Sequence, residues 1–334
     1  MNIIIPMAGR GTRLRPHTLT VPKPLIPIAG KPIVQRLVED LTKVCDEKID
    51  TIGFVIGELE EEQVNQLYAI AKTVGAKAKI FKQDEALGTA HAIYCAEELL
   101  KGKTMVAFAD TLFHADFKLD TSEDGIIWVQ KVEDPSAFGV VKMDTQYRIV
   151  DFVEKPKAFV SDLAIIGIYY FREAEKLKVE IEHLLDKGIK TGGEYGLTDA
   201  LEQLRSKGLT FKPGEVNEWL DCGNKDAVVF TNQRYLEYIK DSDELISPTA
   251  TLTNTIIIPP VYIGKDAVIE NSVIGPHVSI GDATKICDSR LSNSLVQANA
   301  ILNNANLQNS MLGNAVSYKG PTQDVSLGDY TNVT

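Results

Sequence analysis

The sequence predicts an α/β domain, built on a mostly parallel mixed sheet with helices on both faces, followed by a left-handed parallel β-helix. Residues 1–240 alternate short apolar runs with amphipathic stretches, an order typical of a parallel sheet covered on both sides. From about residue 247, aliphatic residues recur every five or six positions. That spacing fits neither a helix, whose period is about 3.6, nor a half-buried strand, whose period is about 2. With 334 residues, the chain is long enough for two domains.

The elements of the first domain follow from its apolar patterning. Short runs rich in Ile, Val and Phe predict strands at residues 2–5, 51–56, 79–81, 105–109, 125–131, 138–142, 148–153 and 164–171. Amphipathic stretches predict helices at residues 32–44, 60–74, 89–100, 173–185, 198–207 and 225–239. The first strands and helices alternate one by one, which is the pattern that indicates the parallel part of the sheet.

The β-helix is predicted from a single repeating feature. The recurring aliphatic positions are Ile263, Ile269, Ile274, Ile280, Ile286, Leu291, Val296, Ile301, Leu307 and Leu312. In a left-handed β-helix, such residues fill the interior on each side of a triangular coil, and the segment has room for about four coils. The predicted domains are therefore residues 1–240, residues 247–317 and, where the pattern stops, an extended tail at residues 318–334.

The charge of the chain is unevenly distributed. The formal net charge of −11 disfavours a nucleic-acid partner, because general nucleic-acid binders are usually basic. The first acidic residue is nevertheless Glu39. The cations that precede it are Arg10, Arg13, Arg15, Lys23, Lys31 and Arg36. One cationic region at the start of an acidic protein suits a small polyanion as partner.

Other classes of protein are disfavoured by what the chain lacks. No apolar run approaches the ~18 residues of a membrane helix, and the stretch at residues 2–8 is too short for a signal-peptide core. We therefore expect a cytoplasmic protein with no membrane partner. The four cysteines are too scattered for a metal site or a disulfide framework. The histidines fall in no triad or ligand spacing and are expected to be structural: His17, His91, His114, His183 and His277.

A glycine-containing cationic loop directly follows the first predicted strand. It reads MAGRGTRLRP at residues 7–16, and PKPL follows at residues 22–25. Its glycines let the backbone approach a ligand and aim N–H groups at phosphate oxygens. Arg13 and Lys23 can neutralise a triphosphate. The spacing is neither that of a Walker loop nor that of the dinucleotide-binding pattern.

Two aspartates and a glutamine stand at positions suited to a ligand. Asp110 follows the apolar run 105–109 and is expected at the carboxyl end of a strand, where the ligand sites of α/β sheets gather. Asp221 lies in WLDCG at residues 219–223. The amide of Gln83 offers one acceptor and one donor side by side, which matches the edge of uracil or thymine. Guanine presents a similar pair, so this residue alone leaves the base open.

Taken together, these segments resemble the sugar-1-phosphate nucleotidyltransferases, a family that includes glucose-1-phosphate thymidylyltransferase and its uridylyl and guanylyl relatives. The loop at residues 8–16 with residues 22–25 is similar to the signature of that family. The resemblance continues in order through Gln83 with LGTA at 87–90, AD at 109–110, FGVV at 138–141, EKP at 154–156, GIY at 167–169 and WLDCG at 219–223. It covers most of the chain, and many members also carry the β-helix.

The resemblance implies a Rossmann-like nucleotidyltransferase domain and a role for each matched residue. The nucleotide-binding residues would be Ala8, Gly9, Gly11, Thr12, Gln83, Gly88 and Thr89. The sugar-binding residues would be Gly139, Glu154, Lys155 and Gly167. Arg13, Lys23 and Lys155 would be catalytic, and Asp110 and Asp221 would be both catalytic and the ligands of Mg²⁺. The segment at residues 193–199 resembles a family stretch near the sugar, although Thr198 there is equally suited to cap a helix.

The implied reaction transfers a nucleotidyl group from a pyrimidine nucleoside triphosphate, dTTP or UTP, to a hexose 1-phosphate. A nucleotide-sugar and pyrophosphate are the expected products of an ordered, in-line displacement at the α-phosphorus. The glutamine at position 83 resembles that of the pyrimidine-using members, whereas a guanylyltransferase acting on mannose 1-phosphate is the alternative for the base. Which hexose 1-phosphate is used stays open.

Two further alternatives bear on function. A non-catalytic nucleotide-sugar sensor or scaffold of the same fold would be expected to lack the arginine, the lysines or the aspartates, all of which are present. An acyltransferase using the β-helix would need more than the single His277 in that segment. We expect the β-helix instead to provide the contact of a homo-oligomer, because the ends and faces of its coils need cover.

Overall fold

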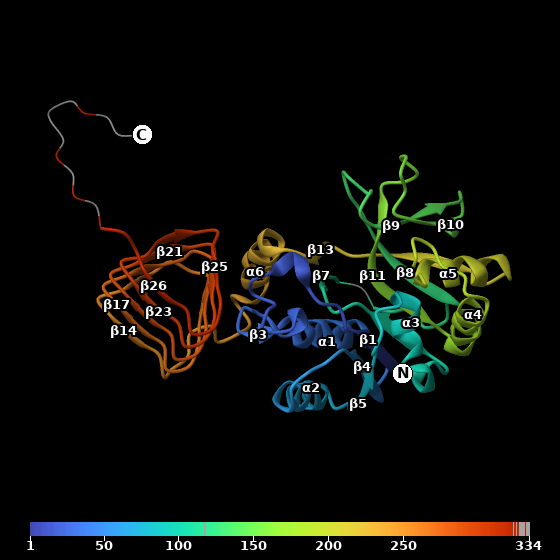
Figure 1. The fold of residues 1–334 in the computed structure, drawn as a ribbon, viewed down its shortest axis with the longest axis horizontal. Coiled ribbons are helices and arrows are strands. Elements are labelled where there is room, and N and C mark those ends of the chain that lie inside the picture. Colours follow the sequence, from blue (N-terminus) through green and yellow to red (C-terminus); the bar gives the residue numbers. More distant parts are fainter. Residues whose placement is uncertain (117, 323, 325, 327–330, 332–334) are drawn as a thin grey trace. The chain divides into compact units, whose positions relative to one another are not determined.

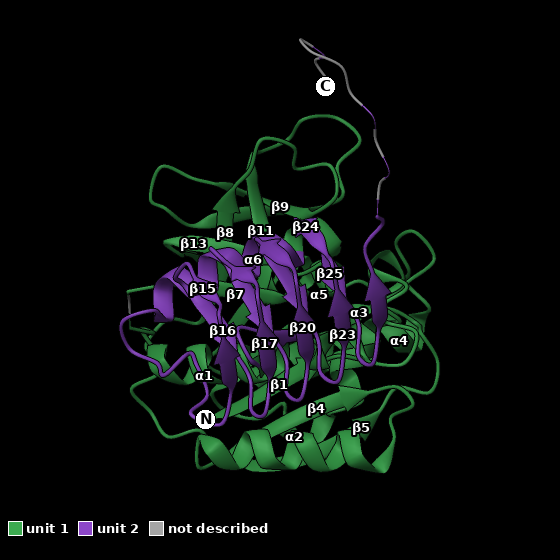
Figure 2. Ribbon diagram, turned by 90° about the vertical axis from the view of Figure 1, so that its left-hand side faces the viewer, with its two compact units in different colours: residues 1–26, 31–227 green, residues 27–30, 228–334 purple. Residues whose placement is uncertain are grey.

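The computed structural model describes residues 1–116, 118–322, 324, 326 and 331 (Figure 1). It divides into two compact units, drawn in separate colours in Figure 2. Unit 1 comprises Met1–Ile26 and Lys31–Ala227, and unit 2 comprises Pro27–Gly30 and Val228–Thr334. None of the helices in the described part of the chain has the length and apolar character that a membrane crossing requires.

Unit 1 is built on a nine-stranded mixed sheet whose main path runs β10-β9-β11-β6-β1-β4-β5, with β8 beside β11 and β12 beside β8. Its strands are β1 (Asn2–Pro6), β4 (Thr51–Ile56), β5 (Lys77–Lys82), β6 (Thr104–Ala107), β8 (Gly125–Lys131), β9 (Gly139–Met143), β10 (Ile149–Glu154), β11 (Leu163–Phe171) and β12 (Phe211–Glu215). Strands β6, β1, β4 and β5 are parallel, whereas β11 is antiparallel to β6, β8 and β9. The mostly parallel mixed sheet predicted from the sequence is confirmed.

Helices cover both faces of this sheet, as predicted. They are α1 (Ile33–Val44), α2 (Glu61–Thr73), α3 (Thr89–Tyr94), α4 (Ala174–Lys187) and α5 (Leu197–Ser206). The apolar sides of α3, α4 and α5 share one core with Ile4, Val55 and Val106 of the parallel strands. In Figure 1, α1 and α2 lie on the other side of β1 and β4. The central strand β1 is buried along its whole length because both faces are covered.

Several element bounds differ from the prediction. The helix expected over residues 89–100 stops at Tyr94, and a separate 3-10 turn, η3 (Glu97–Leu99), follows. Ala96 between them takes φ −103° and ψ 31°, outside the α-helical region, and is fully buried in the core. Other short elements were absent from the sequence prediction: β12, and the two-stranded ribbon formed by β7 (Thr111–His114) and β13 (Glu218–Asp221). Two 3-10 turns, η1 (Thr12–Leu14) and η2 (Lys23–Leu25), and the short strands β2 (Pro27–Ile28) and β3 (Lys31–Pro32) complete the set.

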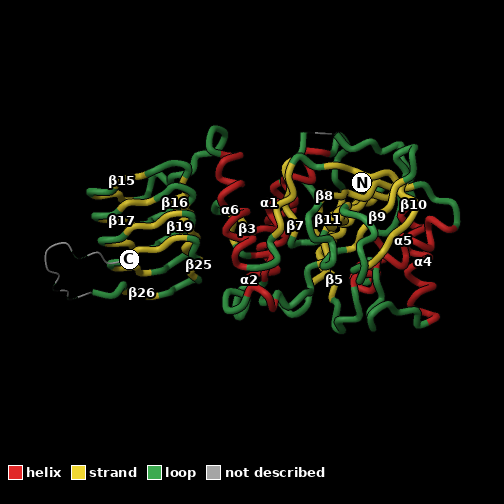
Figure 3. The backbone as a smooth tube through the Cα atoms, turned by 90° about the horizontal axis from the view of Figure 1, so that it is seen from above, coloured by secondary structure: helices red, strands yellow, loops and turns green. Residues whose placement is uncertain are grey.

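Unit 2 consists of α6 (Lys225–Ile239), from Val228 onward, and a parallel β-helix, whose stacked strands are seen in Figure 3. Its three sheets hold five, four and four strands. The first comprises β14 (Thr251–Thr253), β17 (Val268–Glu270), β20 (Lys285–Cys287), β23 (Ile301–Asn303) and β26 (Ser317–Lys319). The second comprises β15 (Ile256–Ile257), β18 (Val273–Ile274), β21 (Arg290–Ser292) and β24 (Asn306–Gln308). The third comprises β16 (Val261–Ile263), β19 (Val278–Ile280), β22 (Ser294–Val296) and β25 (Met311–Leu312).

The interior of the β-helix follows the predicted repeat, with one error of register. Ile286 pairs with Leu302 in the next coil, and Leu302 is fully buried whereas Ile301 is 46% exposed. The coil that ends there is one residue shorter, since hydrogen bonds between coils span 17 residues at Lys265–Asp282 and 16 at Ala298–Asn314. A strand alternates its side chains between two faces, so the one-residue shift exchanges Ile301 for Leu302 in the interior.

The boundaries of the units also differ from the predicted domains. Helix α6 was expected in the first domain, but all except its first turn belongs to unit 2. The segment Pro27–Gly30 joins unit 2 as well, and the N–H of Ala29 donates to Oδ1 of the buried Asn232 at 3.0 Å. The tail predicted from residue 318 begins inside β26, where Tyr318 pairs with Leu302. Residues 323, 325, 327–330 and 332–334 of that tail lie outside the described residues.

Candidate active site

The loop that follows β1 is held open at the end of the parallel strands. The N–H of Met7 donates to the carbonyl of Val55, which continues the pairing of β1 with β4 past Pro6. Gly9, two residues further on, is exposed and has no other heavy atom within 4 Å of the place a Cβ would take. Gly11 takes a positive φ of 57°, and its carbonyl accepts from the Thr18 hydroxyl at 2.8 Å. The backbone of the loop is therefore accessible at Gly9, as close approach of a phosphate would require.

Lys23 is the cation that lies deepest in the site. It begins η2, directly after Pro22, and its side chain is only 13% exposed. Its Nζ lies 2.6 Å from Oδ2 of Asp110, with which it forms an ion pair. Asp110 stands in the turn between β6 and β7, beyond the carboxyl end of the parallel strands, as the sequence predicted.

The two aspartates are brought together by the β7–β13 ribbon. Asp221, the last residue of β13, pairs with Thr111, and the N–H of Cys222 donates to the carbonyl of Asp110 at 2.9 Å. Oδ1 of Asp221 accepts from the N–H of Gly223 at 3.0 Å. Burial, and then the Asp110 carboxylate, raise the pKa of Asp221; the Gly223 N–H, Lys23 and Arg13 offset this only in part. Two carboxylates with a shortage of positive charge fit a cation site.

The turn that carries Asp110 is held to β11 by two hydrogen bonds. The N–H of Phe108 donates to the carbonyl of Gly167, and the Thr111 hydroxyl donates to the carbonyl of Ile166 at 2.7 Å. Gly167 has a φ of 88° and lies where the register of β11 against β8 shifts. The predicted sugar residue Gly167 therefore has a local role, because its carbonyl fixes the backbone of Phe108, two residues before Asp110.

A second wall of the site is formed by Gln83 and the start of α3. Nε2 of Gln83 lies 3.2 Å from the carbonyl of Gly88 and 3.1 Å from Nδ1 of His91. Gly88 has a φ of 118°, and a Cβ there would lie 2.5 Å from the carbonyl oxygen of Tyr195. Only glycine fits this position, because a side chain would meet both backbone strain and a rigid neighbour. The hydroxyl of Thr89 accepts from the N–H of Leu197 at 2.9 Å.

Three of the four predicted sugar residues lie at the β9–β10 hairpin, whereas Gly167 lies on β11. Glu154 pairs with Gly139, and its Oε2 accepts from the Thr198 hydroxyl at 2.7 Å. Lys155 follows with a positive φ of 41° and a side chain that is 66% exposed. Thr198 is the second residue of α5, behind the cap Gly196, so it does not cap the helix as the sequence suggested. Its hydroxyl orients Glu154 instead.

An aromatic contact connects this hairpin to the aspartates. The rings of Phe138 and Trp219 meet edge to face with centroids 5.1 Å apart. The carbonyl of Phe138 accepts from the N–H of Lys155, and Trp219 lies two residues before Asp221 on β13. The Lys155 backbone is thus tied, through one ring pair, to the strand that carries Asp221.

A cavity of about 240 Å³ is lined by some of the site residues predicted from the sequence. The predicted residues that line it are Ala8, Gly9, Lys23, Gln83, Gly88, Thr89 and Asp110. The predicted residues outside its lining are Gly11, Thr12, Arg13, Asp221, Gly139, Glu154, Lys155 and Gly167. Of these, Asp221 is electrostatically coupled to the lining, since the Asp110 carboxylate raises its pKa, and Arg13 lowers that pKa.

Some lining residues were not singled out from the sequence. Ala86, Ala92 and Phe108 contribute apolar surface, and Glu194 contributes a carboxylate. Nothing in their local pattern signals a ligand, because small and aromatic residues at helix and strand ends usually pack. His91, predicted to be structural, contacts the amide of Gln83.

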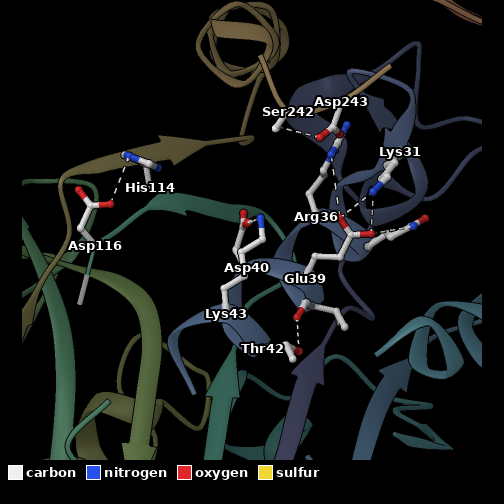
Figure 4. Close-up of polar contacts among 12 residues, drawn as sticks. Lys31, Arg36, Glu39, Asp40, Thr42, Lys43, His114, Asp116, Ser242 and Asp243 are labelled. Carbon is white, nitrogen blue, oxygen red and sulfur yellow. Dashed lines mark hydrogen bonds and ion pairs between the residues drawn. The ribbon is translucent and has the colours of Figure 1, made fainter. Parts of the chain in front are cut away.

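The cationic region of the sequence is divided in the structure. Lys31 lies 2.9 Å from both carboxylate oxygens of Glu39, and Arg36 lies 4.0 Å from the same carboxylate (Figure 4). Arg36 is only 3% exposed on α1. These two cations serve an ion-pair cluster on α1 and do not face the cavity, so the charge pattern predicted too large a polyanion site. Lys23 lines the cavity, whereas Arg13 does not line it and lowers the pKa of Asp221.

Among the described residues, no cluster of three or more His, Cys, Asp or Glu side chains could hold a metal ion. Asp110 and Asp221 supply two carboxylates. A hard cation such as Mg²⁺ is commonly held by one or two protein carboxylates, with water and substrate phosphates completing its shell. The donor set therefore fits a cation that arrives with a phosphate ligand, and it does not fit a closed structural metal site.

A glycine-containing loop, a buried lysine and paired carboxylates lie at the end of a parallel sheet, an arrangement that would suit an enzyme acting on nucleotides. The model of the nucleotidyl transferase family matches residues 2–238, and the chain belongs to this family. It is therefore a transferase whose transferred group is a nucleotide. The resemblance seen in the sequence is confirmed at this level.

Curated relatives include both short and long proteins. The chain is 29% identical to the glucose-1-phosphate thymidylyltransferase of Streptomyces antibioticus, over 95% of its own length and 93% of that protein. It is 31% identical to the bifunctional protein GlmU of Methanococcus vannielii, over 77% of its own length. The chain spans 61% of the length of that GlmU protein.

The fold also resembles that of solved structures. A UDP-glucose pyrophosphorylase complexed with UDP-glucose superposes with a TM-score of 0.59 at 24% identity. The match covers 71% of this chain and 98% of that structure. At this identity, the likeness shows the fold alone.

Proposed function

We propose that the chain transfers a nucleotidyl group from a pyrimidine nucleoside triphosphate, dTTP or UTP, to a hexose 1-phosphate. The observation that carries the proposal is the single cavity lined by the glycine loop, Lys23, Asp110 and Gln83, with Asp221 beside it. The Streptomyces relative is named a glucose-1-phosphate thymidylyltransferase, which is a reaction of this kind. The products here would be a nucleotide-sugar and pyrophosphate.

The chemistry needs no protein nucleophile. An oxygen of the sugar phosphate, already anionic at neutral pH, attacks the α-phosphorus; the bond to the bridging oxygen of the β-phosphate breaks, and pyrophosphate leaves. The task of the protein is to align two polyanions and to stabilise charge on the leaving group. Arg13 and Lys23 are suited to the triphosphate, because Lys23 is buried in the cavity and Arg13 lies near Asp221.

Asp110 and Asp221 would hold Mg²⁺, which when bound supplies positive charge at the α-phosphate. Nζ of Lys23 lies 2.6 Å from Oδ2 of Asp110, and this ion pair partly neutralises the two carboxylates. We infer that Lys23 turns from Asp110 to the phosphates when substrate and cation arrive. The raised pKa of Asp221 marks the charge deficit that the cation would relieve.

The sugar phosphate is assigned to the β9–β10 hairpin. Lys155 would grip its phosphate, because the side chain is 66% exposed and extends from a backbone held by Phe138. Glu154, oriented by Thr198, would accept hydrogen bonds from sugar hydroxyls. Gly139 and Gly167 would allow the sugar to approach the backbone of the hairpin and of β11.

Gln83 is assigned to the base of the nucleotide, and Gly88 and Thr89 beside it are assigned to the nucleotide as well. The phosphates are assigned to the loop residues Ala8, Gly9, Gly11 and Thr12. A guanine base offers a ring N–H and a carbonyl as uracil does, so a guanylyltransferase acting on mannose 1-phosphate is the second candidate. The similarity to a thymidylyltransferase over nearly the full chain favours the pyrimidine.

The β-helix is proposed as the contact of a homo-oligomer of this chain. Its exposed large apolar side chains include Leu252, Ile256, Ile258 and Ile301, of which Ile256 is 62% exposed. Leu252 and Ile256 line the same surface hollow, and a contiguous exposed apolar patch is typical of an interaction site. Replacing Ile256 and Ile258 with Asp in the full chain should lower the assembly mass measured by light scattering. An unchanged mass would refute this contact.

The reaction is tested by a panel of dTTP, UTP, GTP and CTP against glucose, N-acetylglucosamine and mannose 1-phosphates. Pyrophosphate release is measured with magnesium present and again after its removal by a chelator. We expect release with a pyrimidine triphosphate, dependent on both substrates and on the metal. A protein that binds these nucleotides and releases no pyrophosphate with any pair would be a sensor, and the proposal would fail.

A further inference from the structure

The amide of Gln83 is fixed in one orientation by two neighbours. Its Nε2 lies 3.2 Å from the carbonyl oxygen of Gly88 and 3.1 Å from Nδ1 of His91. A backbone carbonyl only accepts, so the amide must turn its NH₂ group, and not its oxygen, toward Gly88. The same nitrogen then faces the ring of His91.

The tautomer of His91 follows from this geometry. Nδ1 must accept the second hydrogen of the Gln83 amide, which makes His91 a neutral imidazole with its proton on Nε2. Both N–H bonds of the amide are then used within the protein. Only Oε1 of Gln83 remains for a ligand in the cavity that Gln83 lines.

His91 itself does not line that cavity. It is half-buried in the first turn of α3, and its backbone carbonyl accepts from the N–H of Cys95. Any effect of its side chain on a bound base therefore passes through Gln83. This is the arrangement of a positioning residue.

A glutamine that offers only an acceptor distinguishes between classes of base. Uracil, thymine and guanine carry a hydrogen on the central ring nitrogen of their pairing edge, and can donate it to Oε1. Cytosine and adenine carry a lone pair there and would oppose the oxygen. A glutamine free to rotate could serve either class, by turning its NH₂ group to the base.

We propose that His91 is a positioning residue that holds Gln83 with its oxygen toward the base, so that the site selects bases with a ring N–H over cytosine and adenine. The inference rests on the proposed function, in that it takes this cavity as the nucleotide site. It reverses the simpler reading of Gln83 as both donor and acceptor to the base. The base carbonyl must then find its donor elsewhere, and backbone N–H groups are the available kind.

The test compares two substitutions of nearly equal size in the full chain. His91→Asn keeps an acceptor atom at the position of Nδ1, whereas His91→Leu places a methyl group there. The readout is the ratio of kcat/KM for UTP to that for CTP, with the best sugar phosphate from the substrate panel. A role in packing alone would alter stability without changing this ratio.

We expect His91→Leu to lower the UTP-to-CTP ratio about tenfold, which is the effect of losing one well-placed hydrogen bond. His91→Asn should keep the ratio within about twofold of the wild type, because its acceptor is preserved. Should His91→Leu not fold, as judged by thermal unfolding, His91→Phe retains a ring without an acceptor and carries the same expectation.

The outcomes separate the two proposals. A wild-type protein that releases no pyrophosphate with any nucleotide would end the proposed function, and this inference with it. An active wild type whose UTP-to-CTP ratio is unchanged in His91→Leu, or lost equally in His91→Asn, would overturn the role of His91 and leave the proposed function intact.

Discussion

The polar groups of unit 1 and unit 2 are organised in opposite ways. In the candidate site of unit 1, Asp110 and Asp221 stand beside each other, and burial raises the pKa of Asp221 while Lys23 only partly compensates. In the β-helix, several buried hydroxyls both donate and accept a hydrogen bond. Ser289 donates to the carbonyl of Cys287 at 2.6 Å and accepts from the N–H of Ala305 at 3.0 Å.

The same relay is repeated from coil to coil. Ser272 donates to the carbonyl of Glu270 and accepts from the N–H of Ser289, and Ser294 makes the equivalent pair with Ser292 and Ser310. The difference shows that polar residues serve different purposes in the two units. Relayed hydroxyls stabilise a fold, whereas carboxylates left short of positive charge keep a site ready for a charged ligand.

The largest expected effect comes from the aspartates. Asp110→Asn or Asp221→Asn should lower turnover about a hundredfold or more, as losing an electrostatic group of the transition state does. Steady-state pyrophosphate release in magnesium measures it. Asp186→Asn, an exposed position on α4, is the control and should keep wild-type turnover. Near-normal turnover in Asp221→Asn would remove this residue from the site.

The same substitution should act on stability with the opposite sign. A raised folded-state pKa means that ionising Asp221 costs stability once the pH rises through that pKa. Without metal at neutral pH, Asp221→Asn should therefore unfold at a higher temperature than the wild type. The gain should vanish below the usual aspartate pKa of about 3.9, where both side chains are neutral. A lower melting temperature at neutral pH would contradict the origin given for the shift.

Alanine substitutions of the two lysines should affect different substrates. Lys155→Ala should raise the KM for the sugar phosphate about tenfold or more and leave triphosphate binding nearly intact, because the exposed Lys155 is assigned to that phosphate alone. Lys23→Ala should weaken the triphosphate or cut turnover, since it also leaves Asp110 without its ion pair. Calorimetric titration with each substrate separates them. Weaker binding chiefly of the triphosphate in Lys155→Ala would mean that the roles are reversed.

A glycine pair tests the wall of the cavity. Gly88→Ala would place a Cβ 2.5 Å from the carbonyl oxygen of Tyr195 at a φ of 118°, whereas Gly75 has a φ of 72° and open space around its Cβ. We expect Gly75→Ala to cost about 1 kcal/mol in the free energy of unfolding. Gly88→Ala should cost about 2 kcal/mol or more and also weaken nucleotide binding. Equal losses in denaturant titrations would show that Gly88 serves only its backbone angle.

The smallest effect on catalysis is expected in the β-helix. Ser289→Ala should destabilise the protein by about 1–3 kcal/mol, because it leaves the buried N–H of Ala305 without its partner and removes one donor from the partly buried carbonyl of Cys287. Pyrophosphate release per folded molecule should not change. Ser310→Ala is the matched control, since among the described residues Ser310 Oγ bonds only to the carbonyl of Gln308. A fall in turnover of Ser289→Ala would show that the β-helix helps to build the site.

The sequence predicted most of the fold because period and alternation are local signals. The six-residue repeat identified the β-helix, and it misplaced only Ile301, where a coil is one residue shorter. The β7–β13 ribbon escaped prediction because its pairing joins segments about a hundred residues apart, and neither strand is long or strongly alternating.

Those site residues could be predicted that lie in short segments of distinctive sequence. Ala8 and Gly9 of the glycine loop line one cavity with Lys23 and Asp110. Lys31 and Arg36 shared the same charge pattern but belong to an ion-pair cluster with Glu39. Charge in a sequence says nothing of which face a side chain takes. The contact between His91 and Gln83 was equally hidden, because it depends on the angle between the start of α3 and the end of β5.

The segment Pro27–Gly30 has a consequence for the order in which the protein is made. It belongs to unit 2, where Ala29 donates to Asn232 and Gly30 lies against the ring of Tyr262. The ribosome delivers it about two hundred residues before its partner on α6. The rest of unit 1 therefore emerges with a short loop whose partners, first Asn232 on α6 and then Tyr262 in the β-helix, have not yet been made. For the same reason, a single genetic crossover that exchanged one β-helix for another would leave this loop behind, and a working chimera must replace residues 27–30 together with residues 228–334.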